Sequence, residues 1–517
     1  MAARLTETWQ VSKPAVVSEK GLVASHHHEA SAIGAQVLAD GGNAVDAAIA
    51  TGLAIGVAEP WMSGIGGCGY MVIYDAETGS TRAIDFGCVA PKRLDPADYP
   101  LKEGGTDDDL FGWPLVVDDR NVQGPLSVAT PGTVAGWALA LERFGTLPWA
   151  EAIAPAIDLA RRGMKVDWYA TLRIAVEARG LAQNRAAADF FLPDGLPPVS
   201  IDPDNLMTLQ ADAQVATLER LRDAGPDDFY KGDIAATIAA DMAAVGGKLD
   251  REDLAAYEAR LVDTQTARYR DATIHVPPGL NAGPTLLDAL ARLEDGWSAS
   301  GKTPDAAAYT AYAESLFAAY RHRLETMGEG NGESCTTHLT VVDARGNMVA
   351  LTQTLLSVFG SRVLLPNIGF LMNNGIMWFD PRPGGPNAMA PGRRPLSNMC
   401  PAVVTRQGGN FALGASGGRR IFPAVMQLIS FMVDHGMTLD QAFHTPRLDV
   451  SGASLVAADT RMPADARAAL AARWKTTEVP YAVTPALYAC PNAVHDLGVE
   501  RHGCAFVMSP WGQVAAG

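Results

Sequence analysis

The stretch TTHLTVVDARGNMVALTQT, residues 336–354, predicts a β-hairpin. Apolar and polar residues alternate on both sides of residues 344–346, as expected for two paired strands. Gly346 stands where this three-residue loop needs a left-handed backbone conformation, which glycine adopts without steric cost. The stretch therefore predicts two neighbouring strands of one antiparallel sheet.

The closing pair of the loop determines the register of this hairpin. If Asp343 pairs with Asn347, Thr336 lies opposite Thr354 and two threonine hydroxyls face each other. Successive side chains point to opposite sides of a strand, so the hairpin has two different faces. The apolar face carries Leu339, Val341, Val349 and Leu351. We expect the other face to be too polar for deep core packing, because it carries Thr336, His338, Thr340, Ala350, Thr352 and Thr354.

The hairpin is preceded by GEGNGESC, residues 328–335, which has no apolar face to bury and predicts a mobile, exposed segment. A threonine hydroxyl becomes a usable nucleophile when its own α-amino group acts as the base. Cutting the chain before Thr336 would supply that amine. On these residues alone, an ordinary strand threonine after an ordinary loop remains the commoner interpretation, because β-branched residues favour strands anyway.

The N-terminal part of the chain predicts a helix next to a sheet. Asn43 is a suitable N-cap for the apolar residues 44–58, which read as a buried helix of small side chains. The glycine-rich residues 64–69 then lead into YMVIYD, residues 70–75, a strand followed by a turn and a hairpin.

The middle of the chain predicts mainly helices. Residues 130–260 have helical periodicity, interrupted near 190–205 by a loop rich in proline and aspartate. Thr303 as N-cap and Pro304 as first helical residue begin another helix, which ends before the glycine at position 328.

A second chemically suggestive region predicts a short strand over 410–413, a tight turn over 414–418 and an apolar helix over 419–432. Backbone N–H groups at the start of that helix would point toward an anion or a developing oxyanion. The same turn matches the Gly-x-Ser-x-Gly nucleophile elbow of serine hydrolases around Ser416. A serine triad therefore stays open as an alternative, with its partners drawn from Asp440, His444, His495 and His502.

Two further motifs have simpler interpretations. Gly64, Gly66 and Gly69 match G-x-G-x-x-G, but a helix precedes them and a strand follows, the reverse of a dinucleotide-binding motif. These glycines are better explained by close passage of the backbone. The run 26–28 of three histidines suggests surface or helix-start residues, because adjacent side chains project in different directions and do not form a metal site. We expect neither a metal nor a cofactor.

Composition narrows the class of protein further. The 517 residues are 48% hydrophobic with a net charge of −16, which favours a folded protein and disfavours nucleic acid as a partner. The first 21 residues lack the apolar core of a secretory signal, and the longest apolar run is shorter than the ~20 residues that span a bilayer. Six cysteines without a CxxC pair fit free thiols in a reduced cytoplasm. We therefore expect a cytoplasmic protein with no membrane partner.

Six blocks of sequence, taken together and in their order, resemble the γ-glutamyltranspeptidases, a family of self-processing N-terminal-nucleophile hydrolases. The blocks are GGNAVDAA (41–48), GIGGCGYM (64–71), TPGTVAGW (130–137), TTHLTVVDARGN (336–347), RPLSNMCP (394–401) and SGGRRI (416–421). The resemblance implies an α+β fold, a four-layer αββα sandwich. It also implies self-cleavage between Cys335 and Thr336, giving a large subunit of residues 1–335 and a small subunit of residues 336–517 that associate as a heterodimer.

The resemblance also implies roles for individual residues. Thr336 would be the nucleophile, Thr354 the threonine bonded to its amine, and the backbone amides of Gly417 and Gly418 the oxyanion hole. The hairpin register places Thr354 opposite Thr336 independently of the resemblance.

The substrate pocket departs from the family pattern. An arginine that holds the substrate α-carboxylate is replaced by Gly87, and the groups that help hold the α-amino end are replaced by Leu356, Gly375 and Trp378. Ser397 is kept, and Asn398 stands where serine is usual. These replacements remove the partners of a zwitterionic amino acid and resemble the branch with cephalosporin acylases.

The sequence thus predicts a mainly hydrolytic threonine amide hydrolase or acyltransferase that acts on a small molecule with a less charged acyl group. A distal carboxylate on that group could be met by Arg393, Arg394, Arg419 or Arg420. The alternatives are a serine hydrolase that uses Ser416 and an unprocessed, non-catalytic binding protein.

Overall fold

The computed structural model describes residues 11–106, 113–327, 336–450, 455–484 and 488–517. The predicted hairpin is present as β12 (Thr337–Val342) and β13 (Met348–Thr354). Its register is the predicted one, since Leu339 pairs with Leu351. The Asp343 N–H donates to Asn347 O at 3.0 Å, and Gly346 has φ +88°. The predictions for residues 328–335, Cys335 included, lie outside the described residues.

The hairpin lies at the centre of a sheet. In the described residues this sheet has seven strands in the order β23-β2-β12-β13-β3-β4-β9. The other five strands are β2 (Leu22–Ser25), β3 (Cys68–Asp75), β4 (Ser80–Phe86), β9 (Arg260–Asp263) and β23 (Gln513–Ala516). Strands from before and after Thr336 therefore lie together in this sheet, and neither part of the chain forms the sheet alone.

A second sheet packs face to face on the first. Its order in the described part of the chain is β1-β22-β21-β17-β16-β11-β10. These strands are β1 (Val16–Ser18), β22 (Arg501–Ala505), β21 (Cys490–Asp496), β17 (Asn410–Ser416), β16 (Ala402–Thr405), β11 (Ala272–Val276) and β10 (Gln265–Tyr269). β12 and β13 of the first sheet contact β17 of the second.

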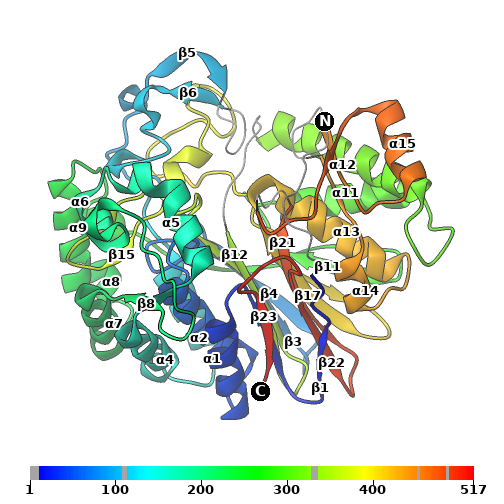
Figure 1. Ribbon diagram of the computed structural model, residues 1–517, viewed down its shortest axis with the longest axis horizontal. Helices are drawn as coiled ribbons and strands as arrows, with labels where there is room; N and C mark the ends of the chain where they lie inside the picture. The colour runs from blue at the N-terminus through cyan, green and yellow to red at the C-terminus, as the bar shows by residue number, and fades with distance from the viewer. Residues whose placement is uncertain (1–10, 107–112, 328–335, 451–454, 485–487) are drawn as a thin grey trace.

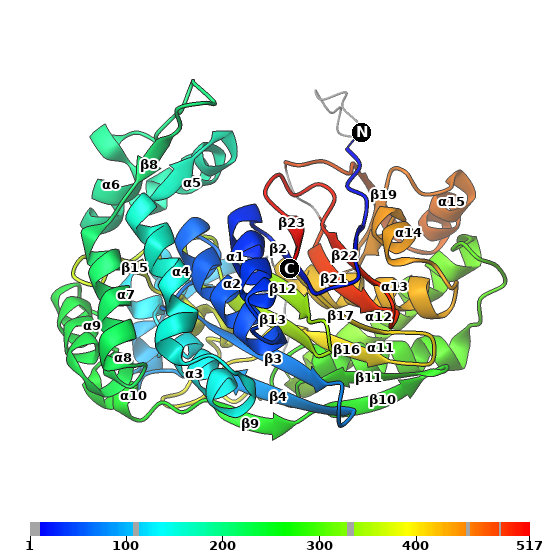
Figure 2. The same ribbon diagram turned by 90° about the horizontal axis from the view of Figure 1, so that it is seen from below.

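Helices cover the outer face of each sheet (Figures 1 and 2). The first sheet is covered by α1 (His28–Ala39) and α2 (Ala44–Ala58). The second is covered by α11 (Gly283–Gly296), α13 (Ile421–Val433) and α14 (Leu439–His444), with α12 (Ala306–Met327) packed on α11. The arrangement is the expected four-layer αββα sandwich.

The predicted buried helix is α2. Asn43 caps it, and its side chain accepts from Val45 N at 2.8 Å and Asp46 N at 3.1 Å. Every residue from Ala44 to Ala58 is buried, because the helix lies between the first sheet and further helices. A uniformly apolar helix has this position when it is covered on all sides.

The middle of the chain adds a helical lobe outside α2, as its periodicity predicts (Figure 2). Its helices are α3 (Thr133–Phe144), α4 (Trp149–Arg162), α5 (Trp168–Leu181), α6 (Arg185–Phe191), α7 (Asp212–Ala224), α8 (Asp228–Lys231), α9 (Asp233–Ala244) and α10 (Arg251–Ala255). The remaining elements are α15 (Ala464–Arg473) and the strands β5 (Leu101–Thr106), β6 (Pro114–Val116), β7 (Met164–Val166), β8 (Met207–Leu209), β14 (Leu364–Leu365), β15 (Phe370–Leu371), β18 (Leu448–Asp449), β19 (Leu455–Asp459) and β20 (Lys475–Val479). Within the described ranges, no helix combines the length and apolar character that crossing a membrane requires.

The prediction that the polar face of the hairpin avoids deep burial is wrong. His338, Thr340 and Thr352 are fully buried, because this face packs against the second sheet. His338 Nδ1 and Thr352 Oγ1 are hydrogen-bonded at 2.8 Å, which meets part of the cost of burying them. The apolar face packs against α2, so both faces of the hairpin are in cores.

Two predicted boundaries also differ from the structure. α12 begins at Ala306, and Asp305 rather than Thr303 caps it, since the Ala308 N–H donates to Asp305 Oδ1 at 2.8 Å. β17 continues to Ser416, three residues beyond the predicted end of the strand, because it keeps pairing with β21 through Ser416.

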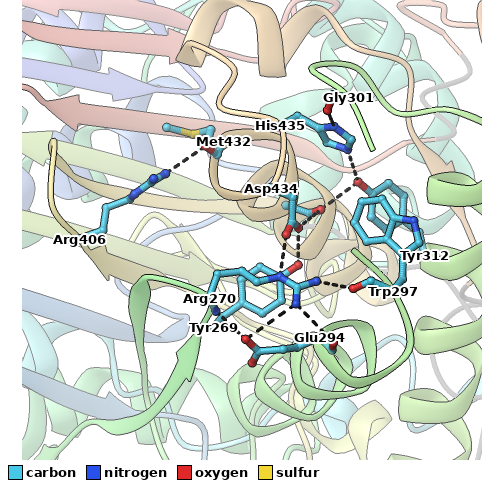
Figure 3. A network of polar contacts seen from close by, with 11 residues as sticks. Tyr269, Arg270, Glu294, Trp297, Gly301, Tyr312, Arg406, Met432, Asp434 and His435 are labelled. Carbon is cyan, nitrogen blue, oxygen red and sulfur yellow. Dashed lines mark hydrogen bonds and ion pairs between the residues drawn. The ribbon is translucent and has the colours of Figure 1, made fainter. Parts of the chain in front are cut away.

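A polar network ties the edge of the second sheet to its helices (Figure 3). Asp434, which follows α13, accepts hydrogen bonds from the Tyr269 hydroxyl, from Ser430 Oγ at 2.6 Å and from Arg270 Nε at 2.9 Å. Arg270 also donates to Trp297 O, just after α11. The buried Asp434 carboxylate therefore joins β10, α11 and α13.

Candidate active site

The four strands at the centre of the first sheet align one row of residues. Thr354 pairs with Cys68 on β3, and the same register continued across β3 and β4 places Cys68 opposite Gly87. Continued toward the start of β12, the hairpin register places Thr336 opposite Thr354. At a strand spacing of about 4.8 Å, Gly87 lies roughly 14 Å from Thr336 at the other end of this row.

The Thr336 side chain is buried, with 1% of the residue exposed. Its hydroxyl has no hydrogen-bond partner within the described part of the chain. Thr354 Oγ1, by contrast, accepts from the Leu356 N–H at 2.7 Å. Thr336 therefore presents a free hydroxyl directly before the first residue of β12. Burying a hydroxyl without a hydrogen-bond partner costs free energy, and functional sites retain such groups.

The Gly417–Gly418 turn lies at the same end of the sandwich. Ala412 on β17 shares an apolar cluster with Val342, and a side chain at Gly414 would collide with the His338 ring. The two strands therefore run in opposite directions, so the end of β17 meets the beginning of β12.

Both glycines of this turn have backbone conformations that other residues avoid. Gly417 has φ +125° and Gly418 has φ +59°. A Cβ at Gly417 would also lie only 2.9 Å from Ala489 Cα. The chain can therefore turn from β17 into the short helical segment Gly418–Arg420 and then α13, which puts backbone N–H groups at the place where an oxyanion hole is expected.

Ser416 has surroundings that oppose the serine-triad alternative. Its Oγ lies 3.3 Å from His26 Nε2, and that nitrogen also lies 3.1 Å from Cys490 O. A carbonyl oxygen only accepts, so Nε2 carries the hydrogen and cannot take the serine proton. In the described residues, none of the predicted partners bonds to Ser416: Asp440, His444, His495 and His502 form other contacts.

The residues expected to line the acyl pocket lie in one apolar cluster. It contains Leu356 and Trp378 together with Cys68, Tyr70, Cys88, Leu396 and Met399. Gly375 has no room for a side chain, since a Cβ there would lie 2.5 Å from Ala129 Cβ. Trp378 Nε1 is buried and has no partner among the described residues.

Of the four arginines considered for a distal carboxylate, Arg394 reaches Gly87. Its Nη1 donates to Gly87 O at 2.7 Å and to Asp85 Oδ1 at 3.0 Å. A Cβ at Gly87 would lie 3.3 Å from that nitrogen and 3.0 Å from Tyr70 Oη. Neighbouring side chains therefore fill the space around Gly87. Arg393 is exposed, and Arg419 and Arg420 lie in the turn that leads to α13.

Sequence reasoning missed Arg323, which is buried on α12 with 1% exposed. It donates to Ser397 O at 2.6 Å and to Asn398 Oδ1 at 3.3 Å, so it contacts two of the residues predicted to bind the substrate. The available signal was a charged residue in phase with the apolar face of that helix, which includes Tyr309, Leu316 and Tyr320.

The histidine run stands at a helix start as predicted, but His26 and His27 are buried rather than at the surface. His27 caps α1, and its Nδ1 accepts from the Glu29 N–H at 3.2 Å. Within the described ranges, no group of three or more His, Cys, Asp or Glu residues could hold a metal ion. Of the three motif glycines, side chains at Gly66 and Gly69 would collide with Leu371 O and Thr352 O, so these two allow close backbone passage as predicted, whereas a Cβ at Gly64 would meet nothing closer than 3.8 Å.

Acid should destabilise the protein through the buried histidine beside Ser416. Burial lowers the pKa of His26 from 6.5 to about 4, so His26 is neutral in the fold while the unfolded chain takes up a proton below pH 6.5. The contribution of His26 to stability should be fully present above pH 6.5 and fall by about 3 kcal/mol as the pH drops to 4. Thermal unfolding between pH 7 and 4 should show that stability declines less steeply for His26→Asn than for wild type, whereas the exposed His28→Asn should decline as wild type does. Equal declines for wild type and His26→Asn would contradict the role of His26 in the loss of stability.

Comparison with known proteins agrees with this geometry. The family model described as Gamma-glutamyltranspeptidase matches residues 30–334 and 325–487. Acylase ACY 1 proenzyme of Pseudomonas sp. strain SE83 is 34% identical over 507 residues, which cover 90% of this chain and 89% of that protein. Glutathione hydrolase proenzyme of Escherichia coli strain K12 is 32% identical over 486 residues, covering 84% and 81%.

A solved structure with the same fold is cephalosporin acylase from Bacillus halodurans. Its TM-score is 0.86 at 24% identity, and the match covers 100% of this chain and 99% of that one. The family match spans most of the chain and includes the hairpin, the glycine turn and the segment of Ser397 and Asn398. The chain therefore belongs to the γ-glutamyltranspeptidase family of N-terminal-nucleophile hydrolases and is an acylase-like hydrolase or acyltransferase.

Proposed function

We propose that this chain cuts itself between Cys335 and Thr336 and then hydrolyses a small-molecule amide through an acyl-enzyme on Thr336. The single observation that carries the proposal is the buried, unpartnered Thr336 hydroxyl at the end of β12, opposite Thr354 in the hairpin register. The proenzyme names of two relatives, an acylase and a glutathione hydrolase, support a processing step. Residues 1–335 and 336–517 would remain associated as a heterodimer, since both contribute strands to both sheets.

In self-processing, the Thr336 hydroxyl oxygen attacks the Cys335 carbonyl carbon. The peptide C–N bond then breaks, its nitrogen takes up a proton, and an ester joins Cys335 to the Thr336 oxygen. Water hydrolyses this ester, which leaves a carboxylate on Cys335 and a free hydroxyl and amine on Thr336.

In turnover, the free amine of Thr336 is the base, with an ordinary α-amino pKa of about 7.7–8.0. It accepts the hydroxyl proton as the oxygen attacks the substrate carbonyl, and it returns the proton to the leaving amine. The Gly417 and Gly418 N–H groups would stabilise the oxyanion, and Thr354 would orient the amine. Water then hydrolyses the acyl-threonine ester.

The acyl group should carry little positive charge. The side chains around Leu356 and Trp378 form an apolar cluster. The nearby Asp85 carboxylate is already held by Arg394 Nη1 at 3.0 Å, so burying an α-ammonium there would be costly. The unpartnered donor Trp378 Nε1 instead favours an acyl group with oxygen acceptors. Relatedness to Acylase ACY 1 supports an acylase activity.

The test is the intact mass of the active, purified protein. Self-cleavage should divide 54.5 kDa into fragments of roughly 35 and 19 kDa, the second beginning at Thr336 by N-terminal sequencing. A single active chain of full length would contradict the proposal and favour a serine hydrolase. A single inactive chain with retained ligand would favour a binding protein.

A further inference from the structure

We propose that Arg323 is a positioning residue that turns the Asn398 amide so that Nδ2 donates a hydrogen bond to an oxygen on the acyl group. The inference rests on the proposed function, because it places Asn398 at the acyl pocket of a Thr336 amidase. It adds a residue that determines specificity and the chemistry it recognises: an acyl chain that ends in a carboxylate or another oxygen acceptor.

The guanidinium of Arg323 is held by four oxygen atoms. Nη1 donates to Asn281 O and Thr285 Oγ1, both at 3.0 Å. Nη2 donates to Ser397 O at 2.6 Å and to Asn398 Oδ1 at 3.3 Å. The residue is 1% exposed and forms no ion pair with a carboxylate in the described part of the chain. The hydrogen bonds of this buried cation therefore hold in place the segments that it contacts.

This contact determines which way the Asn398 amide faces. A guanidinium only donates, so the amide atom facing Arg323 must be the oxygen. The amide nitrogen then points away from Arg323. Nδ2 is buried and has no hydrogen-bond partner among the described residues, although Asn398 is only 2% exposed. A buried amide N–H₂ without a partner can donate a hydrogen bond to a bound ligand.

The neighbours of Asn398 place this residue beside the apolar cluster that is expected to bind the acyl group. Leu396 and Met399, on either side of it in sequence, belong to the same apolar cluster as Leu356 and Trp378. Ser397 Oγ accepts from the Met399 N–H at 3.1 Å, and its hydroxyl hydrogen remains available to a ligand.

The residues around Asn398 therefore offer three hydrogen-bond donors: Asn398 Nδ2, the Ser397 hydroxyl and Trp378 Nε1. A carboxylate can accept from several such groups at once, whereas Asn398 Nδ2 and Trp378 Nε1 cannot accept from an ammonium. A serine at position 398 could donate or accept by rotating its hydroxyl, but the free group of the asparagine held by Arg323 is Nδ2, which can only donate.

The experiment compares kcat/KM for a glutaryl anilide and a pentanoyl anilide, which differ only in a distal carboxylate against a methyl group. Wild type should favour the glutaryl substrate. Asn398→Asp keeps the size of the side chain but replaces the donor with a carboxylate oxygen, so the glutaryl-to-pentanoyl ratio should fall by about 10- to 100-fold. Arg323→Met frees the amide to turn and should lower the same ratio by about tenfold. The exposed Arg321→Met, on the same helix, is the matched control and should keep the ratio.

A double-mutant cycle separates positioning from a merely structural role. In an Asn398→Ser background, Arg323→Met should lower the ratio much less than in the wild-type background, because only the contact with Ser397 O, and not the orientation of an amide, is then lost. The inference is overturned if Asn398→Asp leaves the ratio at the wild-type value, or if Arg323→Met lowers it equally in both backgrounds. Should Arg323→Met fail to fold, Arg323→Lys takes its place: it keeps the charge but loses the forked contact with Ser397 O and Asn398 Oδ1, so it should also lower the ratio, and an unchanged ratio would overturn the inference. A wild type that neither cleaves itself nor hydrolyses either anilide would overturn the proposed function, and this inference with it.

Discussion

Thr336→Ala is expected to leave the chain uncut at 54.5 kDa and to reduce amide hydrolysis by about 10⁴-fold or more. The substitution removes the one atom that the proposal uses both to break the Cys335–Thr336 bond and to form the acyl-enzyme. Loss of a covalent nucleophile has effects of this size because the remaining groups bind the substrate but cannot replace the covalent step. Intact mass and hydrolysis rates of the purified variant measure both effects.

The matched control is the neighbouring Thr337→Ala. Its hydroxyl is also buried and without a partner in the described residues, but Thr337 pairs with Gln353 and lies on the helix-facing side of the hairpin. This variant should still cut itself. Ser416→Ala should likewise process and hydrolyse at rates near wild type. Two fragments from Thr336→Ala, or an inactive but processed Ser416→Ala, would show that the nucleophile is misassigned.

A preference for a glutaryl over a γ-glutamyl anilide is the second large effect we expect, by about 100-fold in kcat/KM. The two substrates differ only in an α-ammonium group. Burying that cation without a counter-charge costs several kcal/mol, and each 1.4 kcal/mol is a factor of ten. The side chains around Leu356 and Trp378 are apolar, and the Asp85 carboxylate beside Gly87 is already paired with Arg394. Side-by-side initial rates at several substrate concentrations give the ratio.

Trp378→Asp is the variant that should reverse part of this preference, because it returns an acidic group to the pocket. Gly87→Arg is a poor choice, since a Cβ at Gly87 already comes within 3.0 Å of Tyr70 Oη and 3.3 Å of Arg394 Nη1. A γ-glutamyl preference of about 100-fold in wild type, roughly 2.7 kcal/mol, would mean that other residues rebuild the amino-acid site.

Local rules were sufficient for the elements whose pattern is decided by near neighbours in sequence. The loop chemistry of Asp343 and Gly346 and the alternation around it gave the hairpin register to the residue. The cap Asn43 and the small apolar side chains after it gave α2 with its observed bounds. Neither result needed the resemblance to a known family.

Contacts between segments far apart in the sequence could not be predicted from these local patterns. The polar face of the hairpin is buried because β17 packs on it, and nothing near His338 in the sequence signals the glycine at 414 that receives its ring. Arg394 lies against Gly87 from 307 residues away. His26 reaches Ser416 across 390 residues, and the hydrogen bond of its Nε2 with Cys490 O prevents it from acting as the base that a serine triad would need.

By itself, the sequence determined the hairpin, the helix α2, the Thr336–Thr354 register and, through its resemblance to a family, the four-layer fold. These features depend on short-range backbone geometry and on the period of apolar residues, which a linear pattern records directly. Only the tertiary structure decided that both faces of the hairpin are buried, that Arg394 occupies the space at Gly87 and that Arg323 orients Asn398. Those outcomes depend on which side chains meet when two sheets and their helices pack, and packing joins residues whose separation along the chain carries no signal of their contact.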